Sequence, residues 1–213
     1  PMRAAFLRAV KAARDAPGSS VWKNNLKQIG LAMHNYHDQH GHFPPPVVIG
    51  PDGKTPHSWR VGILPYLEEA DLYEQYRQNE PWDSEHNKQL LAKIPAAYRH
   101  PKDKPESTNA SYFALVGKGT LMGDKDSKGE AIREITDGTS NTLMIVEAKK
   151  DVPWTKPEDI AYNADRAAAL PQLGGWFEEG FQAVFGDGSV RTITSTIDKT
   201  VLQNLIERGD GQP

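Results

Sequence analysis

The segment from residue 22 to residue 45 constrains the fold more than any other part of the chain. Its apolar residues alternate steps of four and three, which places them on one face of a helix. Gly41 is a natural C-terminal cap, and Pro44 with Pro45 prevents the helix from continuing. The pattern predicts an amphipathic helix over residues 20–40 that covers the core. The residues on its buried face are Trp22, Leu26, Ile29, Met33, Tyr36 and His40.

The remaining segments predict short helices and antiparallel strands, without β-α-β alternation. An Asp-Gly pair at Asp187 and Gly188 separates two apolar runs, which indicates a hairpin. The expected fold class is α+β and pilin-like, with a long N-terminal helix packed on an antiparallel β-sheet, loop-rich insertions and a C-terminal helix. Helices are expected at residues 66–78, 84–94 and 196–208, a helical turn at 157–160, and strands at 59–63, 111–116, 142–148, 181–185 and 190–193.

Length and composition restrict the domain organisation and the class of partner. With 213 residues, the chain is expected to form an N-terminal arm over residues 1–19, including a basic helix at residues 3–15, and a single globular domain over residues 20–213. The net charge of −3 and the lack of a basic stripe argue against nucleic-acid binding. The absence of cysteine excludes disulfides and thiolate metal sites.

The start of the sequence bears on the cellular location. Pro1 precedes Met2, so we interpret Pro1 as a remnant of tag cleavage and expect natural residues to be missing before it. No run approaches the roughly 20 apolar residues that span a bilayer. Contact with a membrane is therefore expected only through a missing N-terminal helix. If Met2 is the true start, the protein is expected in the cytoplasm.

Six sequence blocks between residues 23 and 190 carry a resemblance. They are KNNLKQIG with HNYHD, SWRV with LPYLE, EPWDS, ITDGTSNT, VPWTKPED and FGDGSV. In this order they resemble a prepilin-like family of unknown function that is abundant in planctomycetes and is also labelled bacterial solute-binding-protein-like. The resemblance implies a non-enzymatic, pseudopilin-like domain of the cell surface or of type II secretion. It also implies protein partners or self-assembly, and a membrane anchor in the cell envelope.

The chain departs from the pattern of this family at three positions. Many members carry a Cys where Trp22 stands and another near His100. This chain has neither Cys, so no covalent bond joins these two segments here. Many members also carry a His where this chain has Phe177. Any role proposed for that His in other members therefore cannot be assigned to this chain.

Four tryptophans in predicted loops or strand edges are candidate contacts for a ligand or partner. They support an alternative function, a module that binds a glycan or a small solute, because exposed aromatic rings stack on sugars and on proteins. The competing interpretation is that they fill a loop-rich core. The four residues are Trp59, Trp82, Trp154 and Trp176.

Two further groups could bind metal. Asp137, Asn141, Glu147 and Asp187 offer oxygen ligands, and some of the pseudopilins that the chain resembles hold a structural calcium in their C-terminal loops. The competing interpretation is local Asx turns and caps, with no cofactor. A zinc site on the helix, at His34, His37 and Asp38, would instead indicate a metal-dependent enzyme. The competing interpretation is that His34 forms a hydrogen bond with a neighbouring loop, while His37 and Asp38 face solvent. Because no catalytic motif is present, we expect no enzyme.

Overall fold

A computed structural model describes residues 19–165, 173–209 and 211. The expected helix at residues 3–15 lies outside these residues, as does the expected arm apart from Ser19. The helices are α2 (Ser19–His40), α3 (Trp59–Gly62), η1 (Leu64–Tyr66), α4 (Ala70–Gln75), α5 (Glu85–Gln89), η2 (Leu91–Lys93), η3 (Ala96–Tyr98), η4 (Ile132–Glu134) and α6 (Lys199–Ile206). The strands are β1 (Val47–Ile49), β2 (Pro56–Ser58), β3 (Tyr112–Val116), β4 (Leu143–Glu147), β5 (Ile160–Ala161), β6 (Gly180–Phe185) and β7 (Val190–Thr194).

The long helix α2 confirms the prediction from the apolar period. Five of the six residues predicted on its inner face are buried, from Trp22 to Tyr36. Gly41 has a φ of 78°, and its amide donates to the carbonyl of His37 at 2.7 Å, which ends the helix as expected. His40 is the exception because it is exposed, with Nε2 3.2 Å from the hydroxyl of Tyr66.

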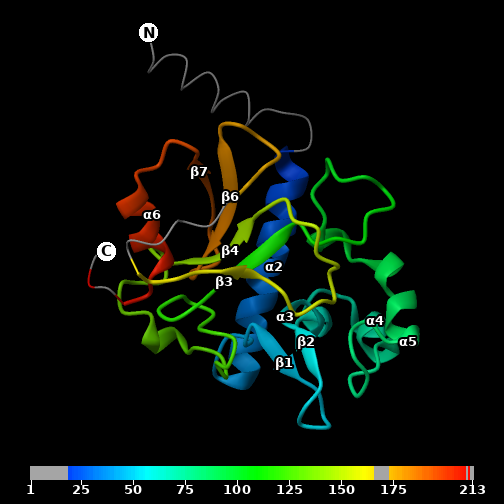
Figure 1. Cartoon of the computed structure of the whole chain (residues 1–213). Helices are drawn as coiled ribbons and strands as arrows, with labels where there is room; N and C mark the ends of the chain where they lie inside the picture. Colours follow the sequence, from blue (N-terminus) through cyan, green and yellow to red (C-terminus); the bar gives the residue numbers. More distant parts are fainter. Residues whose placement is uncertain (1–18, 166–172, 210, 212–213) are drawn as a thin grey trace.

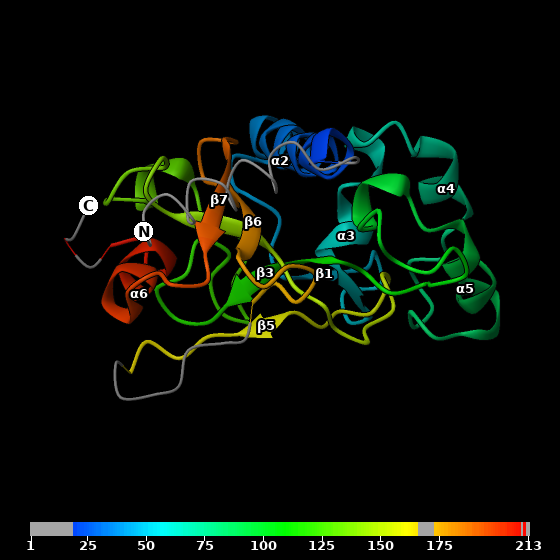
Figure 2. The same ribbon diagram turned by 90° about the horizontal axis from the view of Figure 1, so that it is seen from above.

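A five-stranded sheet has the order β5-β3-β4-β6-β7, and β1 and β2 form a separate antiparallel ribbon. Within the larger sheet all neighbours are antiparallel except β3 and β5, which are parallel. Helix α2 covers one face of this sheet, whereas α6 packs against β4 and lies on the side away from α2 (Figures 1 and 2). The α+β prediction of a long helix on a largely antiparallel sheet is therefore confirmed.

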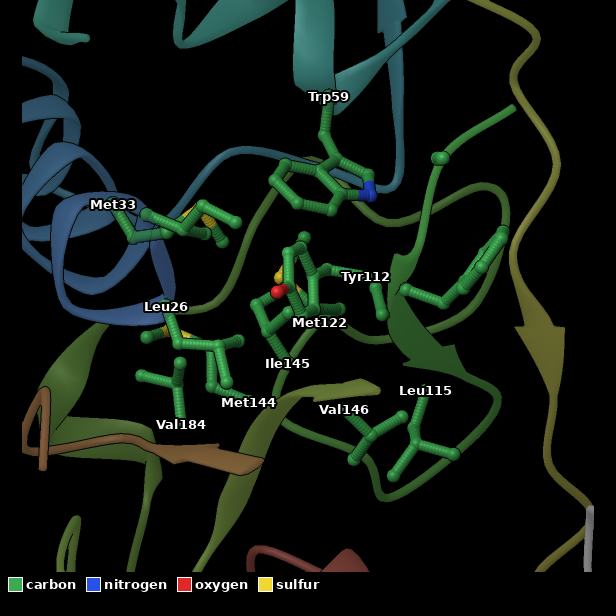
Figure 3. Close-up of a cluster of buried hydrophobic side chains, with 14 of the residues drawn as sticks. Leu26, Met33, Trp59, Tyr112, Leu115, Met122, Met144, Ile145, Val146 and Val184 are labelled. Carbon is green, nitrogen blue, oxygen red and sulfur yellow. The ribbon is translucent and has the colours of Figure 1, made fainter. Parts of the chain in front are cut away.

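The core forms where α2 meets the sheet and the first loops. Figure 3 shows Leu26 and Met33 from α2 facing the strand residues Met144 and Val184, with Trp59 entering from the side. All five side chains are completely buried. This burial supplies the main apolar driving force for packing α2 on the sheet.

Most predicted strands and the hairpin are confirmed, but residues 59–63 do not form a strand. Residues 59–62 form α3 instead, and its first turn is capped by Ser58 Oγ, which accepts from the amide of Arg60 at 3.2 Å. The helix expected at residues 66–78 is divided into η1 and α4, because Glu68 adopts a left-handed φ of 61° that no α-helix continues through. The helical turn expected at residues 157–160 is also wrong, since Ile160 begins β5.

A buried ion pair explains why Arg60 points inward from α3. Its Nη2 lies 2.7 Å from Asp159 Oδ1, and the two side chains are 0% and 3% exposed. Arg60 also donates to the carbonyl of Tyr112 from Nε at 3.1 Å and from Nη2 at 2.9 Å. Asp159 accepts the amide of Ala114 at 2.8 Å and the indole of Trp59. The pair therefore joins α3, β3 and the segment before β5.

We expect Arg60→Met to lower the free energy of unfolding by about 3–5 kcal/mol, because it leaves the Asp159 carboxylate buried without its cation. The matched control is Arg77→Met, which breaks an exposed pair with Glu80 at 2.9 Å and is expected to cost about 1 kcal/mol or less. Urea unfolding monitored by circular dichroism measures both. Equal losses in the two variants would contradict the central role of the buried pair.

Candidate functional site

Two of the four tryptophans predicted as ligand contacts lie in the core instead. The side chains of Trp59 and Trp154 are completely buried. Trp59 Nε1 donates to both carboxylate oxygens of Asp159 at 3.1 Å, and Trp154 Nε1 donates to the carbonyl of Leu91 at 3.2 Å. The prediction of a surface contact is wrong for these two residues, because each ring fills the core while its single polar atom finds an internal acceptor.

The other two tryptophans, Trp82 and Trp176, are half-buried. Trp82 precedes α5, and the Nζ of Lys156 lies 5.9 Å from the centre of its ring. Trp176 borders a pocket of about 540 Å³. Trp176 therefore combines partial exposure with a place in a pocket wall.

Three segments that are distant in sequence form the walls of this pocket, which we call the Trp176 pocket. Residues 102–110 and residues 149–151 meet where Asn109 Nδ2 donates to the carboxylate of Asp151. The third segment contains Trp176. It is held beside the second through Gly174, whose carbonyl accepts a hydrogen bond from the amide of Lys149 at 2.8 Å. The charged residues that line the pocket are Lys102, Lys104, Lys149, Lys150, Asp103 and Asp151.

His100 lies directly beneath Trp176, with ring centroids 4.6 Å apart and planes at 22°. Its Nδ1 accepts the amide of Lys102 at 3.1 Å, so the neutral ring carries its proton on Nε2. This Nε2 is 3.9 Å from Glu147 Oε1, which is too long for a hydrogen bond. Neither atom has a hydrogen-bond partner among the described residues. Beneath the pocket, the structure therefore buries an acid and a base that face each other.

Burial controls the protonation of this pair. It raises the pKa of Glu147 to about 7, although the amide of Gln182, donating at 3.2 Å, opposes the shift. Burial also lowers the pKa of His100 to about 4, against the opposing attraction of Asp103. Between these two values both side chains are uncharged, which avoids the cost of a buried charge without a close partner.

Two further aromatic residues, Trp22 and Phe177, lie around His100. The ring of Trp22 lies 5.3 Å from His100 and 4.6 Å from Phe177, measured between ring centroids. Lys102 Nζ lies 3.7 Å above the ring of Phe177. Aromatic rings therefore enclose His100 on several sides and place a cation at their outer edge.

The four oxygen ligands predicted for calcium do not converge. Asp137 and Asn141 share one turn, in which Asn141 Nδ2 donates to the carbonyl of Asp137 at 3.0 Å. Asp187 lies beside that turn, because its amide donates to the carbonyl of Thr139 at 3.0 Å. Glu147 is completely buried at the far end of β4. A single cation cannot bind all four, so the predicted set is wrong with respect to Glu147.

The histidine cluster on α2 is also divided among different contacts. His37 Nε2 accepts the amide of Ile132 at 3.3 Å, while the ring of His34 packs edge-on against Phe43 at 5.3 Å. Asp38 is exposed. The loop contact expected of His34 is thus made by His37. Within residues 19–165, 173–209 and 211, no three His, Asp or Glu side chains are arranged to hold a metal ion.

Sequence reasoning missed the lysines of the Trp176 pocket and the buried pair beneath it. The predicted strands nevertheless indicate which segments meet at this pocket. When strands 111–116 and 142–148 pair antiparallel, the residues before the first and after the second lie at the same end of the sheet. The strand at 181–185 begins at that end too, since β6 is antiparallel to β4. The four lysines and the ring of Trp176 could therefore have been placed together from sequence. The lysines are Lys102, Lys104, Lys149 and Lys150.

We expect Glu147→Gln to stabilise the protein increasingly as pH rises. In the parent protein the pKa of Glu147 is about 7 in the folded state, above its ordinary value of 4.5, so the unfolded state loses this proton first. Stability from this group is complete below pH 4.5 and is lost as pH rises to about 7. The stability difference between variant and parent should grow by ~3 kcal/mol across that window.

Urea unfolding of both proteins at about pH 4.5 and about pH 7.5 measures this difference. His100→Gln is the matched control with the opposite sign. The pKa of His100, about 4, lies below its ordinary 6.5, so its contribution to stability is present at neutral pH and is lost on acidification. A Glu147→Gln difference that is independent of pH would contradict the burial argument.

Comparisons with known proteins identify a family. The profile of SBP_bac_10, described as a protein of unknown function (DUF1559), matches residues 12–133, which is more than half of the chain. The match includes α2 and β3 and ends before β4. Comparison with curated proteins and with solved structures gives no match. The chain belongs to the SBP_bac_10 family of proteins of unknown function.

Proposed function

We propose that this chain is a non-enzymatic, pseudopilin-like domain of a surface or secretion-associated protein, and that it acts through contacts with partner proteins or with copies of itself. The observation that carries the proposal is the packing of α2, a helix of 22 residues, across one face of a largely antiparallel sheet (Figure 2). The sequence blocks that resemble prepilin-like proteins point to the same architecture.

The burial of the acid–base pair supports a role other than catalysis. His100 and Glu147 have strongly shifted pKa values, which often mark catalytic groups. Their residues are, however, only 3% and 0% exposed. A general acid or base must come within hydrogen-bond reach of its substrate. In this conformation neither side chain can do so.

We also propose that the protein is located in the cell envelope and is held there by a membrane anchor outside the described residues. Among those residues, no helix has both the length and the apolar character needed to cross a bilayer. Pseudopilin-like proteins are anchored by an apolar helix that precedes the globular part. We therefore propose that a segment on the N-terminal side of α2 anchors the protein.

Fractionation of the native cells tests this function. We expect the full-length gene product in the envelope fraction, with an N-terminus shortened by removal of a leader, as measured by immunoblotting and mass spectrometry. Known cytoplasmic and membrane proteins serve as controls in the same fractions. Recovery of an unprocessed product in the cytoplasmic fraction would overturn the pseudopilin-like proposal.

The Trp176 pocket favours a second candidate function, a module that binds a glycan or small solute. At about 540 Å³ the pocket falls in the size range of small-ligand sites, roughly 300–1,000 Å³. We expect at least one member of a panel of neutral and acidic oligosaccharides to bind the parent protein and to bind Trp176→Ala at least tenfold more weakly. The matched control is Trp82→Ala, at the other half-buried tryptophan. A panel without any binder would overturn this candidate.

A further inference from the structure

The lysines of the Trp176 pocket provide positive charge that forms no salt bridge with a carboxylate among the described residues. None of Lys104, Lys149 and Lys150 forms an ion pair with another described residue. The fourth, Lys102, approaches the carbonyl of Trp176 at 3.5 Å. Four lysines line one small pocket against two aspartates, and this excess of positive charge favours an anion, which relieves the repulsion between lysines and accepts charge-assisted hydrogen bonds.

The two carboxylates of the pocket limit which anions fit. Asp103 Oδ2 accepts the amide of His100 at 2.8 Å and the hydroxyl of Ser111, and Asp151 accepts from Asn109. A carboxylate has about four lone-pair sites, so these contacts leave acceptor capacity. Spare acceptors beside lysines would repel a ligand that carries only negative charge. They suit a ligand that also donates hydrogen bonds, as hydroxyl groups do.

The ring of Trp176 sets a third requirement for a ligand of the pocket. One face of the Trp176 ring is covered by His100 at a centroid distance of 4.6 Å, so a ligand can stack only on the opposite face. A flat, weakly polar face of a ligand is needed there. The C–H face of a sugar ring meets this requirement and carries its hydroxyl groups around the edge.

We infer that the Trp176 pocket binds a small carboxylated saccharide. The lysines would hold the carboxylates, Asp103 and Asp151 would accept its hydroxyl groups, and Trp176 would stack on one sugar ring. This inference rests on the binding-module function and gives the chemical class of its ligand. It is independent of whether the domain is pseudopilin-like.

Calorimetric titration with three defined probes tests the inference on the folded chain. Digalacturonic acid carries both carboxylates and hydroxyl groups, lactose carries hydroxyl groups alone, and adipate carries two carboxylates alone. We expect digalacturonic acid to bind at least about tenfold more tightly than either of the others. Its affinity should fall as the salt concentration rises from about 0.05 to about 0.5 M, because salt screens exposed charges.

Variants locate the binding in the pocket. Lys149→Ala combined with Lys150→Ala should weaken binding of digalacturonic acid about tenfold or more, because charge-assisted hydrogen bonds are lost. Trp176→Ala should weaken it similarly, and Trp176→Phe less so because a ring remains. The matched controls are Lys88→Ala, at an exposed lysine on α5, and Trp82→Ala, which should bind like the parent protein. Thermal unfolding of each variant checks that it is folded.

The other outcomes overturn the inference in distinguishable ways. If lactose binds as tightly as digalacturonic acid, the pocket binds glycans but the role of the lysines is wrong. If adipate binds equally well, the pocket is a general anion site and the roles of Trp176 and the carboxylates are wrong. If digalacturonic acid does not bind, or binds the pocket variants unchanged, the inference fails, while a binder from the oligosaccharide panel would still support the broader function.

Discussion

The buried ion pair between Arg60 and Asp159 is the interaction on which the rest of the structure depends. Residues 99 positions apart are joined at 2.7 Å in the interior, where neither charge can be solvated. Arg60 lies with its guanidinium carbon 4.7 Å from the ring centre of Trp59 and 4.8 Å from that of Phe113. The hydroxyl of Tyr98 donates to the carbonyl of Arg60 at 2.6 Å. Such a pair tolerates little displacement, because separation leaves a bare charge in the core.

This interaction also determines where the candidate site forms. Arg60 fixes the carbonyl of Tyr112, the first residue of β3, and Tyr112 pairs directly with Glu147 at the end of β4. At that end of the sheet, Glu147 faces His100, and His100 supports the ring of Trp176. The pocket is therefore built at one end of the sheet, beside the interior strands β3 and β4, although its walls are loops. A loop site on such a scaffold can hold a defined geometry for a ligand.

Local patterns predicted much of the fold because they depend on neighbouring residues. The period of α2, its stop at Gly41 and the Asp187-Gly188 turn follow from backbone and side-chain preferences over a few residues. Residues 59–63 show where this reasoning fails. Apolar residues alternate there, which favoured a strand, yet residues 59–62 form α3 and the Arg60 side chain is completely buried. Its partner Asp159 lies far away in sequence, so no local pattern could reveal it.

The same distinction applies to the candidate residues. Trp59 and Trp176 were both predicted to contact a ligand or partner, but one fills the core and the other borders a pocket. The amino-acid sequence by itself determined the helix-on-sheet class and the hairpin, because periodicity and turn chemistry are local properties. It also determined the family, because sequence blocks can be recognised without the fold. Which tryptophan is exposed, which charges are buried, and which lysines share a pocket were decided by the tertiary structure, because burial and Coulomb energy depend on contacts between residues that are distant along the chain.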